Sequence, residues 1–108
     1  MAAFSEDIIN AVWNAARQVE GVNPDLWRKD IFGAWIRRDN YGVHTLFGWE
    51  IDHFMPISHG GNDDLDNLNA MQWQNNLQKS NNYPQFESKI TAQGNTNIEK
   101  VVSWRVKK

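Results

Sequence analysis

The sequence of 108 residues contains no cysteine and no long apolar run. Without cysteine, disulfide bonds and thiolate zinc sites are excluded. No stretch approaches the roughly 18–20 apolar residues that a membrane-spanning helix needs, and the N-terminus lacks the basic and then apolar pattern of a secretory signal. We therefore expect a cytoplasmic protein with no membrane partner.

Positive charge is missing from the middle of the chain. Residues 49–78 contain no Lys or Arg and five acidic residues, whereas residues 79–108 contain six basic and two acidic residues. This distribution fits a cation site beside a phosphate-binding surface, and it fits equally well acidic turns beside a solvated tail. Charge alone does not decide between these two interpretations.

Large aromatic residues, by contrast, are plentiful. Six Trp and five Phe supply apolar surface for a core. A chain of this length fits one domain, and the sequence shows no repeat, low-complexity tract or linker. We therefore expect a single domain over residues 1–108.

Polar and apolar patterns predict a mixture of helix and strand. Residues 5–20 have helical spacing, and Ser5 can cap the N-terminus of this helix. Strands are predicted over residues 33–38, 46–54 and 100–106.

Residues 55–80 are harder to interpret. Residues 55–66 have the composition of a loop. The stretch 65–80 fits one helix, but it also fits a short strand over 67–71 followed by a helix over 72–80. Periodicity does not decide between these two readings.

One constellation of polar residues stands out. Asp52 and His53 stand together near the end of a strand pattern, ahead of Pro56 and the pair Gly60-Gly61. The polar residues that follow are Asn67, Asn76 and Lys79. Neighbouring side chains in a strand point to opposite faces. Either one of the two side chains is buried and the other exposed, or the strand twists or bulges after His53 so that both reach one site.

The order and spacing of these residues resemble the HNH endonuclease family. The resemblance is strongest over residues 49–80, with a core motif over about 46–82. It implies an α+β fold around a ββα-metal core, in which two short antiparallel strands pack on one helix and hold a single divalent metal ion. A preceding helix and flanking strands would be added to this core. The resemblance favours strand and then helix over residues 65–80.

The resemblance also implies a role for each residue of the motif. Asp52 and Asn76 would be the metal ligands. His53 would be the general base that activates water, and Asn67 would hold the loop backbone near His53. Lys79 would face the phosphate backbone of the substrate.

The sequence departs from the family pattern in two places. Many relatives carry pairs of Cys that bind a structural zinc, but Gln72 and Asn75 occupy the later pair of positions here. We therefore expect no structural zinc and a core held by packing; the candidates are Trp49, Trp73 and Phe54. Asn76 stands where many members have His. Because an amide oxygen is a harder ligand than imidazole, Mg²⁺ or Mn²⁺ is expected.

Together these features predict an endonuclease that hydrolyses DNA phosphodiester bonds. Arg37 and Arg38 beside a turn, and His59 in the loop, are further candidates for contacts with the nucleic acid. Sequence preference is expected to be weak, or supplied by a protein partner. The alternative is a nucleic-acid-binding or assembly module that retains the fold with weak catalysis. The small size and the net charge of −2 favour that alternative.

Overall fold

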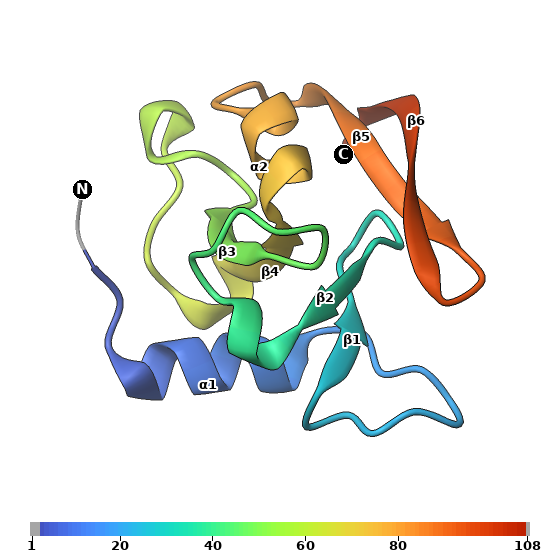
Figure 1. Cartoon of the computed structure of the whole chain (residues 1–108). Helices are drawn as coiled ribbons and strands as arrows, with labels where there is room; N and C mark the ends of the chain where they lie inside the picture. The colour runs from blue at the N-terminus through green and yellow to red at the C-terminus, as the bar shows by residue number, and fades with distance from the viewer. Residues whose placement is uncertain (1–2, 108) are drawn as a thin grey trace.

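The computed structural model describes residues 3–107 and shows a mixed α+β chain (Figure 1). Three two-stranded antiparallel sheets pair β1 with β2, β3 with β4, and β5 with β6. The elements in chain order are α1 (Glu6–Ala15), β1 (Trp27–Lys29), β2 (Trp35–Arg37), β3 (Trp49–His53), β4 (Leu68–Gln72), α2 (Trp73–Lys79), β5 (Gln85–Gln93) and β6 (Thr96–Arg105). Short 3-10 turns lie at Arg38–Asn40, Ile57–His59 and Leu65–Asn67.

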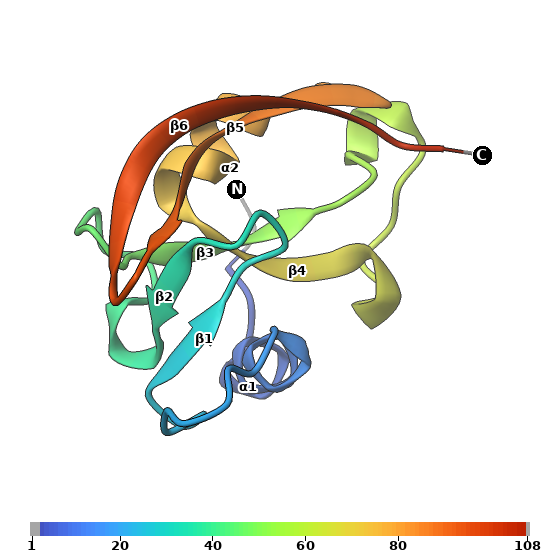
Figure 2. The ribbon, with the colours of Figure 1, turned by 90° about the vertical axis from the view of Figure 1, so that its right-hand side faces the viewer.

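The β3–β4 hairpin forms the central layer. Helix α1 covers one face of it, and α2 lies on the other side together with the long β5–β6 hairpin (Figures 1 and 2). The hairpin is in regular register from Trp49 opposite Gln72 to His53 opposite Leu68. The strand and helix over residues 68–79 confirm the second of the two readings of that stretch.

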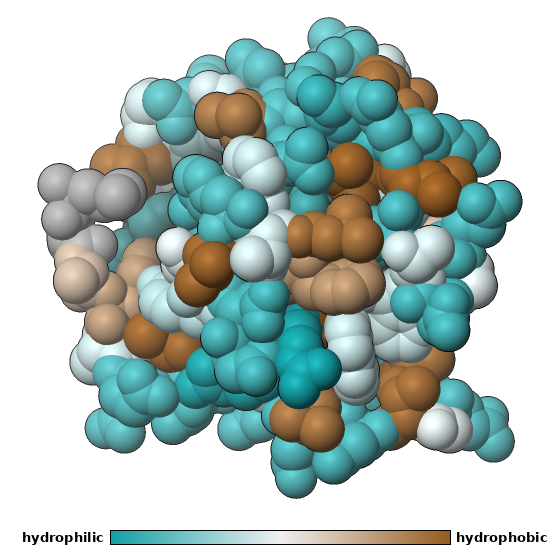
Figure 3. Space-filling view, viewed as in Figure 1, coloured by the Kyte–Doolittle hydropathy of each residue, from teal (hydrophilic) through white to brown (hydrophobic). Residues whose placement is uncertain are grey.

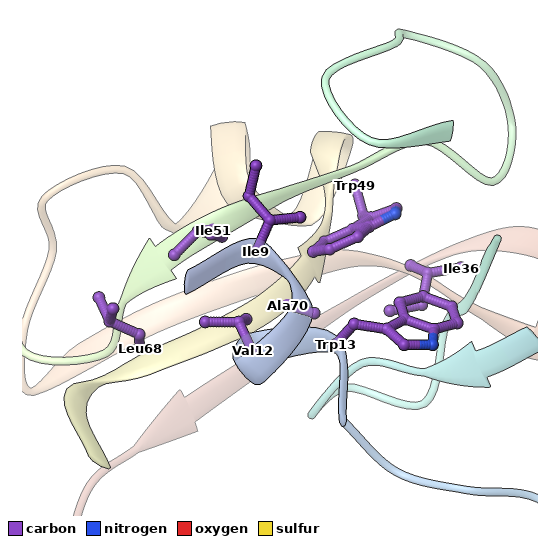
Figure 4. Packing of buried hydrophobic residues seen from close by; sticks show 8 residues of the cluster. All are labelled: Ile9, Val12, Trp13, Ile36, Trp49, Ile51, Leu68 and Ala70. Carbon is purple, nitrogen blue, oxygen red and sulfur yellow. The ribbon is translucent and has the colours of Figure 1, made fainter. Parts of the chain in front are cut away.

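The main apolar core lies between α1 and the β3–β4 hairpin (Figure 4). Ile9, Val12 and Trp13 recur at helical spacing on α1, so they share one face of the helix. The residues they pack against are Ile36, Trp49, Ile51, Leu68 and Ala70. Of these residues, Trp49 is fully buried, as expected for a core aromatic.

Helix α1 is shorter than the sequence predicts. Ser5 caps its N-terminus by accepting a hydrogen bond from the Ile8 amide, but the helix ends at Ala15 rather than at residue 20. Arg28 explains this end, because its buried guanidinium donates to the backbone carbonyls of Asn14 and Ala16. These are carbonyls that a continuing helix would use internally, so a side chain from β1 replaces the next helical turn.

The β5–β6 hairpin was only partly predicted. Strand β6 begins earlier than residue 100, and β5 was not predicted at all. Alternate side chains of β5 face the protein interior, namely Phe86, Ser88 and Ile90. Because the middle one is polar, the sequence does not show the apolar alternation that predicts a strand. Hydrophilic residues cover most of the face that Figure 3 shows. No helix among residues 3–107 is long and apolar enough to cross a membrane.

A buried polar cluster joins the loop after β1 to β4, α2 and β5. Asp30 is 1% exposed, and its carboxylate accepts four hydrogen bonds, from the backbone amides of Phe32, Ala34 and Gln72 and from the Asn75 side chain. Burial raises the pKa of the Asp30 carboxyl, and these donors counteract that effect. The carboxylate therefore ties together segments that are far apart in the sequence.

Gln72 and Asn75 complete this cluster. The Gln72 side chain caps α2 by accepting from the backbone amides of Gln74 and Asn75. Asn75 is fully buried, and its side chain bonds to the backbone of Lys89 and Ile90 on β5. Buried hydrogen bonds therefore join these elements in addition to the packing that the sequence predicts.

Replacing Asp30 tests the cluster. In the wild type, both oxygen atoms of Asp30 accept hydrogen bonds. In Asp30→Asn an NH₂ group replaces one of these oxygen atoms and cannot accept, so at least one buried hydrogen bond is lost and its donor is left unpaired. We expect the free energy of unfolding to fall by roughly 3 kcal/mol or more, measured by urea denaturation. Asp66→Asn, a change at an exposed carboxylate, is the matched control and should have little effect. Equal stability of the two variants would contradict this account.

Candidate functional site

A cleft of about 660 Å³ runs along the free edge of β3. Strand β4 pairs with the other edge, and the four consecutive residues Glu50, Ile51, Asp52 and His53 all line the cleft. The remaining lining residues are His44, Pro56, Ile57, Ser58, Trp73, Asn76, Leu77, Ser80 and Asn81. The structure therefore brings Asp52, His53 and Asn76 to one place.

The neighbours Asp52 and His53 reach this cleft without a bulge. Pairing is regular through His53, and the Phe54 amide continues it by donating to the Asn67 carbonyl. Strand β3 ends at His53 as expected, but its pairing with β4 contains no bulge, so the expected bulge is wrong. Side chains from both faces of a strand can reach a cleft at its open edge, so the alternation of the strand is kept.

Asp52 is buried among polar partners. Its side chain is 5% exposed, and it accepts hydrogen bonds from Lys79 Nζ at 3.2 Å and from Asn69 Nδ2 at 3.1 Å. Burial raises the pKa of the Asp52 carboxyl, and the ammonium of Lys79 and the amide of Asn69 counteract this.

Lys79 does not face solvent. Its side chain is fully buried, and its ammonium also donates to the His53 carbonyl at 3.1 Å. The ring centroids of Phe54 and Phe86 lie 6.0 and 5.3 Å from the ammonium nitrogen. The prediction that Lys79 faces the phosphate backbone is therefore wrong, because its ammonium is buried and forms an ion pair with Asp52.

His53 is held at the mouth of the cleft. Its Nε2 lies 2.6 Å from Oδ1 of Asp63, and the ring stands 6.0 Å from that of Phe4. An ionised carboxylate only accepts hydrogen bonds, so in the neutral imidazole Nε2 carries the proton and Nδ1 is the basic nitrogen. His53 is 24% exposed and Asp63 is 79% exposed, which leaves the pair open to water.

Asn67 closes the loop that follows His53. Its side chain accepts from the Met55 amide and donates to the carbonyls of Met55 and Asn62. Gly61 lies against the same place, because a Cβ on it would be only 1.8 Å from the Met55 carbonyl oxygen. The loop backbone beside His53 is thus fixed by one amide side chain and one close backbone approach.

Asn76 reaches across from α2 to β3. Its Nδ2 donates to Oε1 of Glu50 at 3.1 Å, and the other carboxylate oxygen of Glu50 lies 3.6 Å from Nε2 of His44. His44 in turn stacks on Trp73, with ring centroids 4.2 Å apart. Trp73, expected as a packing aromatic, therefore lines the cleft. Phe54 does pack in the interior, against a second buried apolar cluster of Phe32, Met71 and Phe86.

Three predicted nucleic-acid contacts lie outside the lining of the cleft. Arg37 pairs with Asp39, and Arg38 is bound to Glu6 and Asn10 of α1. His59 is exposed in the loop near Tyr83. Their contacts with a nucleic acid stay predictions.

A search against protein-family models matches residues 38–85 to the HNH endonuclease family. Residues 38–85 form an HNH domain. No curated protein and no solved structure matches the chain. The match covers β3, β4 and α2 and includes every residue that lines the cleft. It indicates a nuclease or nucleic-acid-related function.

The oxygen atoms that could hold a cation in the HNH domain belong to Asp52, Asn76 and Glu50, which all line the cleft. Within residues 3–107, no group of three or more His, Cys, Asp or Glu side chains is arranged to hold a metal ion. Carboxylate and amide oxygens nevertheless suit a small hard cation that keeps several waters. Each ionised carboxylate offers about four lone-pair positions, so the hydrogen bonds from Lys79 and Asn69 leave further lone pairs of Asp52 available to a cation.

Sequence reasoning did not find Asp63 or Asp30, and it did not place Asn69 beside Asp52. Asp63 stands in a run of loop residues with Asp64 and Asp66, and nothing in the sequence separates it from these neighbours. Asn69 follows from the strand register, because it lies directly opposite Asp52. Its Oδ1 is buried and has no hydrogen-bond partner among residues 3–107.

The loop bonds of Asn67 yield a stability prediction for the HNH domain. Asn67→Ala removes one acceptor and two donor interactions with the loop backbone. We expect a loss of roughly 2–4 kcal/mol of unfolding free energy, measured by urea denaturation. The exposed Asn14→Ala on α1 is the matched control and should change stability little. A loss no larger than in that control would contradict the role of Asn67.

Proposed function

We propose that this protein is an endonuclease that hydrolyses DNA phosphodiester bonds with one divalent cation, Mg²⁺ or Mn²⁺, and with His53 as the general base. The observation that carries the proposal is the cleft, where Asp52, His53 and Asn76 lie together in a segment that matches the HNH endonuclease family.

The barrier to the reaction requires more than a base. Uncatalysed phosphate-ester hydrolysis is so slow that an enzyme must lower its barrier by up to roughly 23 kcal/mol or more. A positioned general base contributes about 10²–10⁴-fold, or roughly 3–5.5 kcal/mol. A bound divalent cation would lower the barrier further, since it polarises the phosphate and stabilises the negative charge that develops in the transition state. Oxygen atoms of Asp52 and Asn76 would hold this cation.

The residues of the chain have separate tasks in this proposal. His53 takes a proton from the attacking water at Nδ1, while Asp63 accepts from Nε2 and keeps the ring in that tautomer. Asn67 keeps the backbone at Met55 in place, so that the loop after His53 does not move. Lys79 holds the buried carboxylate of Asp52 in one orientation.

Loss of the base is the direct test of this function. His53→Ala should reduce cation-dependent nicking of supercoiled plasmid by at least about 100-fold, because no other group replaces the proton acceptor. Circular dichroism and the melting temperature, measured in parallel, should show that the variant folds. If the folded variant nicks plasmid as fast as the wild type, His53 is not the base.

One observation favours the alternative, a binding or assembly module with weak catalysis. Both oxygens of Asp52 already accept hydrogen bonds, one from a buried ammonium, so the carboxylate is partly neutralised. Plasmid nicking measured with and without the chelator EDTA separates the two functions. A nuclease should lose all nicking in EDTA and regain it when excess Mg²⁺ or Mn²⁺ is added, whereas a module would bind DNA with no nicking in either condition.

A further inference from the structure

The contact between Glu50 and Asn76 carries a further inference, which rests on the proposed function. Glu50 lies two residues before Asp52 on β3, and its Oε1 is 3.1 Å from Nδ2 of Asn76 on α2. Both residues line the cleft. No other side-chain hydrogen bond of Asn76 is found among the described residues, so Glu50 alone decides how this amide is turned.

The chemistry of the pair fixes the orientation of the amide. A carboxylate has only acceptor positions, so the group of Asn76 that faces Glu50 must be the NH₂. The carbonyl oxygen therefore points away from Glu50. That oxygen is the only atom of the Asn76 side chain that can bind a hard cation, because the amide nitrogen has no available lone pair.

We propose that Glu50 is the positioning residue that turns the Asn76 oxygen toward the cation site. Without Glu50 no described side chain holds the amide in this orientation, and a flip by 180° would bring the NH₂ to the side of the cation. A group behind a ligand that fixes its orientation typically contributes 10–100-fold to metal affinity.

A direct-ligand role for Glu50 is the competing explanation. It would make the negative charge of Glu50 essential, whereas positioning needs only an acceptor at Oε1. Glu50→Gln keeps an acceptor oxygen and removes the charge. Glu50→Ala removes both, so this pair of variants separates the two explanations.

The helix supplies a matched control. Gln78, also on α2, donates from Nε2 to Oε1 of Glu87 at 3.0 Å, which is the same kind of amide–carboxylate bond. Neither residue lines the cleft. Glu87→Ala therefore removes an equivalent contact of α2 with a strand and should leave cation affinity unchanged.

The experiment is a calorimetric titration with Mn²⁺ alone, without DNA. Glu50→Ala should weaken Mn²⁺ binding by roughly 10-fold or more, whereas Glu50→Gln should restore most of the affinity. In an Asn76→Ala background, Glu50→Ala should have no further effect, because the ligand that it orients is gone. Equal losses in Glu50→Gln and Glu50→Ala, or a full effect of Glu50→Ala without Asn76, would overturn the proposal.

A second readout needs neither bound metal nor nuclease activity. In ¹⁵N NMR spectra of the metal-free protein, the side-chain NH₂ signals of Asn76 should move in Glu50→Ala and stay in place in Glu87→Ala. Unchanged Asn76 signals in Glu50→Ala would overturn the positioning role. If these signals move but no variant binds Mn²⁺, the contact stands and the metal-dependent function fails, so the two failures are distinguishable.

Discussion

The buried ion pair between Lys79 and Asp52 sets the geometry of the cleft. It joins the last turn of α2 to β3, and the side chains are 0% and 5% exposed. Each charge alone would cost several kcal/mol to remove from water, so each requires the other inside the fold. The same ammonium also binds the His53 carbonyl. One side chain therefore fixes the helix relative to both the proposed metal ligand and the residue that carries the proposed base.

A second set of buried polar contacts gives the domain its rigidity. The chain has no cysteine, so no thiolate-bound zinc can hold this region. Asp30, Gln72 and Asn75 instead connect the loop after β1, the start of α2 and strand β5 through hydrogen bonds. These bonds are directional and well shielded from water, so they can keep α2 in place as a metal cross-link would.

The sequence allowed the central elements to be predicted, but not the contacts between them. Periodicity alone leaves residues 68–79 undecided. The strand and the helix found there were predicted from the resemblance to the HNH family, which Asp52, His53 and Asn76 carry. The direction of Lys79 could not be read from its position, because burial of a charge depends on a partner that the fold supplies. The end of α1 was missed for a similar reason, since Arg28 from another element terminates it.

We propose that a divalent cation binds in the cleft beside β3, between Asp52 and Asn76. Paramagnetic Mn²⁺ tests it directly, because it broadens the NMR signals of nearby nuclei. At substoichiometric Mn²⁺, we expect selective loss of the backbone signals of residues 50–53 and of residues around Asn76. Broadening confined to the exposed carboxylates of residues 63–66, or no localised broadening at all, would contradict it.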